Sequence, residues 1–550
     1  MGSMEMAKNA MQTARQGAEI AGHNLANASN PIYARQRVKI SSAVAIPTDK
    51  GTQGTGSEVA RLEQIRDYTI DKALVSEKSV TKYLEAKQLQ LRRAEASLGE
   101  TLDQQSIDAG ESYGSYGVAD GLTGLFNSFQ SLSSNPTSIA ERQAVLFNAQ
   151  KLTDKMNIVD RRLGDLRSSI NDEVKDEIDN VNAKIEAIAY LATSIGNTKV
   201  VEGAANEIRD AMQESLEDLS ESANIITTTN ERGKLSLFVD GYEMVTDNAM
   251  TGSVKLHTDS NGMRFLADSK SGDVLTLQSG SVKGLIDARD DSIKNLQDQL
   301  NSIANNLISE VNTLHQTGFN LSGTNDSSLK FFTGTNASDI GVNSTITDDP
   351  RLLQTAGTTI SGHVIDGNPT STDIITKNAH GYTTGQAIIF SGSAPTGASV
   401  GVNYYVNATG TNNFKLHETR TDALSETSAL EFSSDGSFDM KTFDVGDNTV
   451  IRAMAEAGTN AVSGLSDMTY GEYYGNTVSR FGQDIALTDT QLIDQQAVQT
   501  MLEKQRDSVQ GVSIDEEVAD LVVYQRAFQA SARMISTMDT LMGDILNMQR

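Results

Sequence analysis

The sequence has 550 residues, which is long enough for several domains, and it contains no cysteine. The missing cysteines exclude disulfides, thiolate catalysis and zinc–thiolate sites. With 72 acidic and 45 basic side chains the net charge is −27. Such a surface repels nucleic acid and anionic membranes, so we expect neither as a partner.

The first thirty residues predict a helix with a seam of small side chains. Apolar residues recur there at alternating steps of three and four, at Met4, Ala7, Met11, Ala14, Ala18, Ala21, Leu25 and Ala28. Because alanine buries little apolar area, we expect this helix to need further neighbours around it. The same residues lack the continuous apolar core of a secretory signal, so we expect export, if any, without a cleaved signal.

The segment NLANASNPIYARQRVKI, residues 24–40, is expected to bend the chain. Asn27, Asn30 and Pro31 end the helix, since the residue before a proline is pushed out of the helical region. A short extended piece follows at Val38 and Ile40. The candidate residues that fix the bend are Asn24, Asn27, Asn30 and Tyr33.

Helical and strand-like stretches alternate through the middle of the chain. After a loop at 47–57, the apolar periodicity predicts helices at about 58–102, 122–129, 137–224, 284–315 and 450–508. Short strands separated by Asp-Gly, Asn-Gly and Ser-Gly turns are expected at 233–283. A second stretch of strands and turns, rich in Thr, Ser, Gly and Asn, is expected at about 358–441.

The last forty residues predict the clearest helix. Its apolar seam is Leu521, Tyr524, Phe528, Ser531, Ile535, Met538, Met542 and Ile545, again with a seven-residue repeat. Ser513 is the expected N-cap, and Glu516 completes a capping box. The pattern alone leaves open an ordinary antiparallel helix pair or a coiled coil that neighbouring subunits complete. The candidate interface is Met11, Ala18, Leu25, Leu521, Tyr524, Phe528, Ile535, Met538, Met542 and Ile545.

These elements predict a mainly α, multidomain α+β protein with a discontinuous, rod-like architecture. Residues 1–45 and 509–550 are expected to form a terminal coiled-coil core domain. The expected helical-bundle domain comprises residues 46–230, 284–330 and 445–508. Two central β regions complete the division, at 231–283 and at 331–444, the second including an inserted β module at about 358–441.

The sequence shows no catalytic constellation. Its six histidines are scattered, and no phosphate loop, nucleophile elbow or HExxH motif is present. The stretches Asp259–Gly262 and Asp366–Asn368 have oxygen ligands for calcium, but as hairpin turns they need no ion. We therefore expect no enzyme, no cofactor, and no catalytic or metal site.

Both ends of the chain resemble a known family. The paired terminal motifs of bacterial flagellar rod, hook and hook-associated axial proteins are similar to NLANASNPIYARQRV and GVSIDEEVADLVVYQRAFQASARMISTMDTLMGDIL. The interior stretches Leu125–Leu152, Val282–Gly323, Phe331–Pro350 and Val478–Glu517 resemble the FlgK family of hook-associated proteins. This chain has Ile32 where the family usually has glycine before the tyrosine, and the module at about 358–441 interrupts the family pattern.

The resemblance implies a structural protein of the flagellum that polymerises as a ring between hook and filament through its terminal helices. The implied partners are copies of itself, the hook subunit below, a second junction protein or the filament side above, and an export chaperone on the C-terminal helix. It implies type III export to the extracellular hook–filament junction and a role in flagellum assembly and motility. The alternatives are a hook-type axial subunit and a secreted coiled-coil adhesin with a β receptor-binding module.

Overall fold

The chain folds into two units, and each is assembled from stretches that lie far apart in the sequence. The first unit comprises Met1–Gln90, Ser168–Arg289 and Ala486–Arg550, and the second comprises Leu91–Arg167 and Asp290–Ile485. This computed structural model describes residues 2–48, 51–99, 117–198, 205–231, 233–365, 374–391, 393–433, 436–443 and 446–548. Three helices contribute residues to both units, and they are α2 (Tyr68–Leu98), α4 (Ile139–Thr198) and α11 (Tyr470–Gln510).

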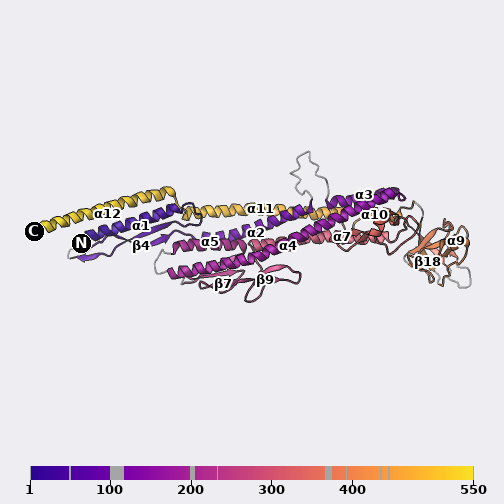
Figure 1. The fold of residues 1–550 in the computed structure, drawn as a ribbon, viewed down its shortest axis with the longest axis horizontal. Helices are drawn as coiled ribbons and strands as arrows, with labels where there is room; N and C mark the ends of the chain where they lie inside the picture. The colour runs from indigo at the N-terminus through magenta and orange to yellow at the C-terminus, as the bar shows by residue number, and fades with distance from the viewer. Residues whose placement is uncertain are drawn as a thin grey trace, which may run out of the picture. The chain divides into compact units, whose positions relative to one another are not determined.

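The first unit contains both ends of the chain. Helices α1 (Gly2–Ala26) and α12 (Ile514–Met548) lie side by side, and the two chain ends lie at the same end of this pair, as the indigo and yellow ribbons of Figure 1 show. Strand β1 (Gln36–Ser42) pairs antiparallel with β4 (Ser57–Gln64), and β2 (Ile46–Thr48) pairs with β3 (Gly51–Gln53) between them.

The predicted loop at 47–57 and the predicted helix start near residue 58 are therefore wrong. Residues 57–64 form a strand because β1 supplies a complete antiparallel partner, with Val38 opposite Leu62. Helix α2 begins only at Tyr68, where the Asp67 carboxylate accepts the Thr69 amide at 2.8 Å as an N-cap. It ends before Gly99, whose φ of +65° is the left-handed conformation that stops helices.

The rest of the first unit combines helices with a small sheet. Helices α5 (Asn206–Ser222) and α6 (Ser281–Asp287), with the π-turn η1 (Ala288–Ile293) at the unit boundary, join parts of α2, α4 and α11. The sheet has the order β5 (Ile225–Thr229), β6 (Leu235–Val239), β7 (Tyr242–Thr246) and β8 (Ala249–Met250). A hairpin of β9 (Val254–Thr258) and β10 (Arg264–Asp268) follows. The strands expected at 233–283 are confirmed at β6, β9 and β10, but the one expected at residues 273–277 is wrong, because these residues make only an isolated bridge between Val274 and Ala267. Strand β5 adds one before that stretch.

The second unit has a helical part with a buried aromatic core. Its elements are α3 (Val118–Ser134), α7 (Lys294–His315), β11 (Phe332–Thr333), β12 (Gly341–Val342), α8 (Ser344–Asp348), η2 (Pro350–Leu352), α10 (Thr449–Glu456) and η3 (Ser463–Leu465), with parts of α4 and α11. The rings of Phe129, Phe331 and Phe332 pack edge to face with centroids 4.6–5.9 Å apart. The buried Arg142 guanidinium donates to the carbonyl of Leu353 at 2.6 Å and so braces the segment before the next module.

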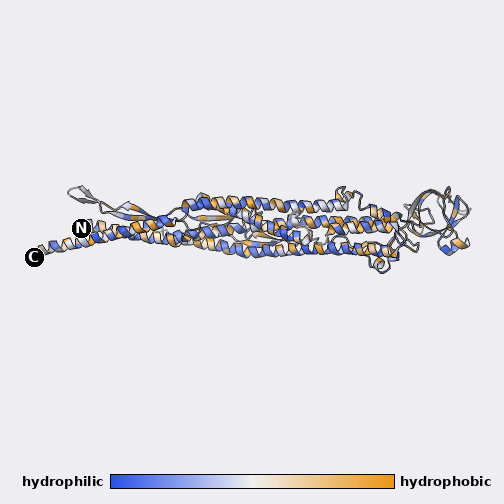
Figure 2. Cartoon of the chain, turned by 90° about the horizontal axis from the view of Figure 1, so that it is seen from above, coloured by the Kyte–Doolittle hydropathy of each residue, from blue (hydrophilic) through white to orange (hydrophobic). Residues whose placement is uncertain are grey.

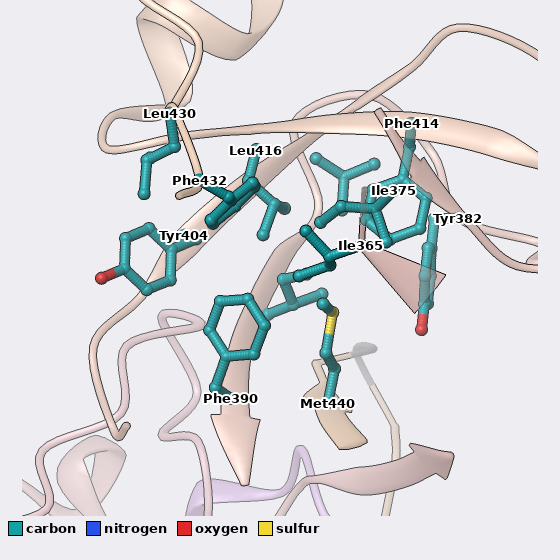
Figure 3. Packing of buried hydrophobic residues seen from close by; sticks show 12 residues of the cluster. Ile365, Ile375, Tyr382, Phe390, Tyr404, Phe414, Leu416, Leu430, Phe432 and Met440 are labelled. Atoms are coloured by element: carbon teal, nitrogen blue, oxygen red, sulfur yellow. The ribbon is translucent and has the colours of Figure 1, made fainter. Parts of the chain in front are cut away.

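That module is a closed six-stranded barrel. The strand order is β13 (Thr358–Ile365), β14 (Ile375–Thr376), β17 (Asn413–His417), β16 (Tyr404–Ala408), β15 (Ala387–Ser391) and β18 (Gly436–Thr442), and a short helix, α9 (Arg420–Ser425), follows β17. Figure 3 shows its apolar interior, where Phe390, Phe414 and Phe432 point inward. Thr358 pairs with Thr442, so the chain enters and leaves the barrel at neighbouring positions.

The predicted fold class, a mainly helical α+β protein with β modules, is confirmed. The rod-like arrangement and the four-part division of the chain stay predictions. The turn at Asp259 is closed by its own side chain, which accepts the amides of Asn261 and Met263 at 2.9 and 2.8 Å. The proposed turn at Asp366–Asn368 lies outside the described residues. Among the helices that the structure describes, none is long and apolar enough to cross a membrane.

Candidate functional site

The terminal helices pack in an antiparallel register. Gly17 of α1 faces Tyr524 of α12, and Asn24 contacts Glu517, so later residues of α1 meet earlier residues of α12. The Tyr524 ring lies against the Gly17 backbone so closely that a Cβ built at Gly17 would be 2.4 Å from Cε1 of the ring. A side chain at residue 17 would therefore fit only if the Tyr524 ring or the helices moved.

The α1 side of the contact is built from alanines at seven-residue spacing. Ala7, Ala14 and Ala21 are buried. The predicted interface residues Met11 and Ala18 are only half-buried, and Leu25 is exposed. Within the chain, the small residues of the predicted seam are therefore buried more fully than its larger ones, and the predicted assembly interface stays a prediction.

The α12 side of the contact is half-covered. We call the set Leu521, Tyr524, Phe528, Ser531, Ile535, Met538 and Met542 the first seam. Leu521, Tyr524, Ile535 and Met538 are half-buried, whereas Phe528 is 37 % and Met542 53 % exposed. Ile545 lies in α12, but its side chain is outside the described residues. Helix α1 alone therefore leaves part of the first seam in contact with water.

A second heptad runs along α12 beside the first. We call its members the second seam: Val523, Ala527, Ala530, Met534, Thr537, Leu541 and Met548, with Asp544 as its charged position. All of them are exposed, Val523 by 61 % and Leu541 by 51 %. Figure 2 shows hydrophobic and hydrophilic residues alternating along the helix that ends at the C mark. The sequence analysis missed this seam, although the same three-four spacing would have revealed it.

The bend is organised by a buried polar hub around Asn24. The Asn24 side chain donates to the carbonyl of Gln36 at 2.8 Å and to Glu517 Oε2 at 2.9 Å. Its Oδ1 accepts the Tyr33 hydroxyl at 2.7 Å and the Gln36 amide at 3.0 Å. One asparagine therefore fastens the end of α1, the chain after the bend and the start of α12.

Arg35 adds charge to this hub. Its Nε donates to Glu517 Oε1 at 2.6 Å, and its Nη1 donates to Glu516 Oε2 at 2.8 Å. Burial opposes the charged guanidinium, but the two carboxylates outweigh it and raise the pKa of Arg35. Burial together with nearby carboxylates raises the pKa of the Tyr33 hydroxyl above its usual range. Arg35 and Glu517 were not predicted, because they lie 482 residues apart in the sequence. Gln36 was not predicted either, although its partner Asn24 is only 12 residues away.

The remaining bend residues act locally. Asn27 donates to the carbonyl of His23 at 2.9 Å, and Asn30 Oδ1 accepts the Ile32 amide at 3.0 Å. Ile32 has no positive φ, so isoleucine is accommodated where the family usually has glycine.

The start of α12 departs in part from the predicted capping box. Ser513 Oγ accepts the Glu516 amide at 3.5 Å. The Glu516 carboxylate contacts Arg35 of the bend instead of the Ser513 amide that a capping box requires. The described residues contain no group of three or more His, Asp or Glu side chains that could hold a metal ion.

Comparison with known families matches two stretches of this chain. The model described as "Flagellar hook-associated protein FlgK helical domain" matches residues 106–332. The model described as "Flagellar basal body rod FlgEFG protein C-terminal" matches residues 505–548, which contain α12 and both seams.

Full-length relatives and a solved structure agree with these matches. Flagellar hook-associated protein 1 of Escherichia coli strain K12 is 21 % identical, with 99 % of each chain covered. The protein of the same name from Bacillus subtilis strain 168 is 22 % identical, with 99 % of this chain and 97 % of the relative covered. The flagellar hook junction protein FlgK from Burkholderia pseudomallei has the same fold, with a TM-score of 0.54 at 15 % identity, over 80 % of this chain and 100 % of the other.

The helical domain, the terminal helix pair and these relatives define a structural protein of the flagellum, of the hook-associated class. The chain is similar to proteins of the FlgK type over nearly its whole length, and its residues 106–332 match the model of the FlgK helical domain. This likeness implies assembly with the hook and with other flagellar subunits.

Proposed function

We propose that this protein is the junction adapter that forms a ring between hook and filament, and that its terminal helices are the assembly interface. The observation that carries the proposal is the second seam of α12. It is a heptad of exposed small and apolar residues along one face, and a helix with such a face gains free energy by packing against another helix. The solved relative from Burkholderia pseudomallei is described as a hook junction protein.

The occupant we propose for the second seam is a terminal helix of a neighbouring copy. Helix α1 covers the first seam only in part, and it presents buried alanines with exposed positions on either side. Neighbours on both sides of α12 would complete a core that one chain leaves open. The helices then become fully packed only on incorporation, and the loss of mobility is offset by buried apolar area.

The same interface suggests the other partners. In the assembled flagellum the ring would contact the hook subunit below and a second junction protein, or the filament side, above. Before assembly, an export chaperone that covers α12 would shield the second seam from water and from premature association. The protein would then reach the extracellular junction through the flagellar type III export apparatus.

The decisive experiment places a charge on the second seam. We expect Met534→Asp to give a folded, soluble monomer by circular dichroism and sedimentation, and to fail to restore filaments in a strain that lacks the gene. Gln529→Asp adds the same charge on the face of α12 away from both seams, and it should restore filaments. Normal filament numbers with Met534→Asp would show that the second seam is not the interface.

A further inference from the structure

An open cavity lies in the first unit, between the sheet that begins with β5 and the helices α2, α4 and α5. Its volume is about 470 Å³. Small-molecule sites in proteins typically have about 300–1,000 Å³. The described residues that line the cavity all belong to the first unit, and they include no member of either seam or of the polar hub. The cavity is therefore separate from the proposed assembly interface.

Short side chains explain why this space is not filled. Ala192 lines the cavity from α4, Thr227 and Thr229 from β5, and Gly233 from the residues before β6. Because Thr227 and Thr229 are two residues apart in one strand, their side chains point to the same face of the sheet. Side chains this short do not span the distance to the facing helices, and the cavity is the space that they leave.

Part of the wall is apolar. We call Ile195, Met212, Leu216 and Leu235 the apolar lining. Ile195, Leu216 and Leu235 are less than a tenth exposed, and Met212 is half-buried. An apolar group placed against them would leave water and contact aliphatic side chains, which is favourable. The apolar lining therefore suits the hydrocarbon part of a ligand.

The polar part of the wall has an excess of positive charge. It carries Arg66, Lys72 and Arg209 but only one carboxylate, that of Asp71. The chain as a whole has the opposite balance, with 72 acidic and 45 basic side chains. Asp71 is already paired, since Arg66 Nη1 lies 3.4 Å from its Oδ2 and Gln510 donates to its Oδ1 at 3.2 Å. The remaining charge at the cavity is therefore positive.

Two cations and two hydroxyls of this wall are available to a ligand. Lys72 makes no ion pair or side-chain hydrogen bond with the residues that the structure describes. Arg209 donates from Nη1 to Asn206 Oδ1 at 2.9 Å and has no carboxylate partner in the described part of the chain. The hydroxyls of Thr227 and Thr229 make no hydrogen bond within the same described ranges. Because lysine and arginine offer only donors, the group that suits them is an anion.

We propose that this cavity binds a small amphipathic anion, a molecule that joins a short apolar chain or ring to one carboxylate, sulfonate or phosphate. Its apolar part lies against the apolar lining, and its anionic head accepts from Lys72 and Arg209. The proposal concerns the soluble chain and does not depend on ring assembly. Its failure is therefore distinguishable from a failure of the proposed function.

Sodium octanoate is the probe, because it joins one carboxylate to an unbranched alkyl chain. It is titrated into the full chain, and binding is followed by calorimetry and by hydrogen–deuterium exchange. We expect saturable binding at one site in each chain, with protection of amides in α5 and β5. Octanol has the same alkyl chain without the charge, and it should bind about tenfold more weakly or less, because charge-assisted hydrogen bonds are lost.

Variants of the wall separate charge from shape. Lys72→Gln combined with Arg209→Gln should weaken octanoate binding about tenfold or more and leave octanol binding unchanged. Lys175→Gln removes an exposed lysine of α4 that does not line the cavity, and it should keep the natural affinity. Ala192→Phe fills the cavity and should abolish protection by both probes. If Ala192→Phe does not fold, Met212→Trp fills the cavity from a half-buried position.

Several results would overturn the proposal. They are an absence of octanoate protection in α5 and β5, protection confined to α12, and equal affinities for octanoate and octanol. An unchanged octanoate affinity in the variant that lacks both cations would also overturn it. Protection of the same amides by phosphatidylglycerol vesicles, but not by octanoate, would assign the cavity to a lipid surface instead of a free ligand.

Discussion

The inserted barrel and the terminal helix pair differ in how far their apolar side chains are buried. In the barrel, Phe390, Phe414 and Phe432 are fully buried, and the sheet closes on itself and has no free edge. In the helix pair, Val523 and Leu541 point into water. Two helices can cover only one stripe of each other, whereas a closed sheet completes its core within one chain. The barrel therefore buries its apolar core without a partner, whereas the helix pair retains apolar surface for binding.

This difference predicts where substitutions act. A substitution in the barrel core should lower the free energy of unfolding of the barrel. It should not affect assembly through α12. A change on the exposed face of α12 should leave the chain folded and affect assembly. The predictions below are ordered from the largest expected change in free energy to the smallest.

The largest effect is expected in the barrel core. Phe390 packs against the rings of Tyr404, Phe432 and Phe438, with centroids 5.8, 6.4 and 6.1 Å away. Phe390→Ala should destabilise the barrel by about 3–5 kcal/mol through lost burial and a cavity. Hydrogen exchange of β15 and β18 measures this loss. Val402 is exposed, so Val402→Ala should leave the exchange protection of these strands unchanged. If the amides of α12 lost as much exchange protection as those of β15 and β18, the barrel would not be a separately stable core.

A smaller loss is expected where the two terminal helices cross. Gly17→Ala places a methyl group against Tyr524 and forces the helices apart, which should cost about 1–3 kcal/mol. Urea unfolding followed by far-ultraviolet circular dichroism, with exchange of α1 amides, measures it. Gly22 has open space around it, so Gly22→Ala should stabilise α1 by about 0.5–1 kcal/mol. An equal change in the free energy of unfolding for Gly17→Ala and Gly22→Ala would show that the close contact at Gly17 does not limit the helix packing.

Breaking the polar hub around Asn24 should lower the free energy of unfolding by as much as Gly17→Ala does, or slightly less. Glu517→Gln keeps the shape of the side chain but removes the charge that Arg35 contacts, and the site is only 3 % exposed. We expect a loss of about 1–2 kcal/mol, concentrated at the start of α12 and the bend. Protease accessibility near residue 35 is the measurement. Asp515→Asn, an exposed neighbour at the same helix start, should change it little.

The smallest effect on the terminal helices is expected from removal of the whole barrel. Gly357 donates to Asp447 Oδ2 at 3.0 Å, and Thr358 pairs with Thr442, so a short linker can replace residues 358–442. Exchange protection of α1 and α12 should stay within about 0.5 kcal/mol of the natural value. We also expect motility to be retained. Loss of junction assembly on this deletion would show that the barrel is structural rather than accessory.

The sequence predicted the elements whose signals are local. The heptads of α1 and α12 and the strands after residue 233 follow from periodicity alone. The apolar residues Val59, Leu62 and Ile65 have the three-residue spacing of a helix rather than the alternation of a strand, and only pairing with β1 makes residues 57–64 a strand. Closure of the barrel likewise depends on pairings between β13 and β18, about 75 residues apart, which no local pattern encodes.

The candidate site was predictable in outline and not in its contacts. Asn24 and Tyr33 could be named from the bend, and both lie in the polar hub. Glu517 was not predicted to lie there, because its partners, Asn24 and Arg35, lie more than 480 residues earlier. The burial of Ala7, Ala14 and Ala21 in place of Met11, Ala18 and Leu25 depends on where Tyr524 lands on Gly17. That register is a tertiary property.

The antiparallel register of α1 and α12 also ties assembly to synthesis of the chain through α12. Gly17 meets Tyr524, so α1 finds this helical partner only after the intervening domains have been made. A chain that stops before α12 lacks both seams. The helix pair thus acts as a check on synthesis: only a chain that extends through α12 carries the surface through which, on our proposal, it joins its neighbours.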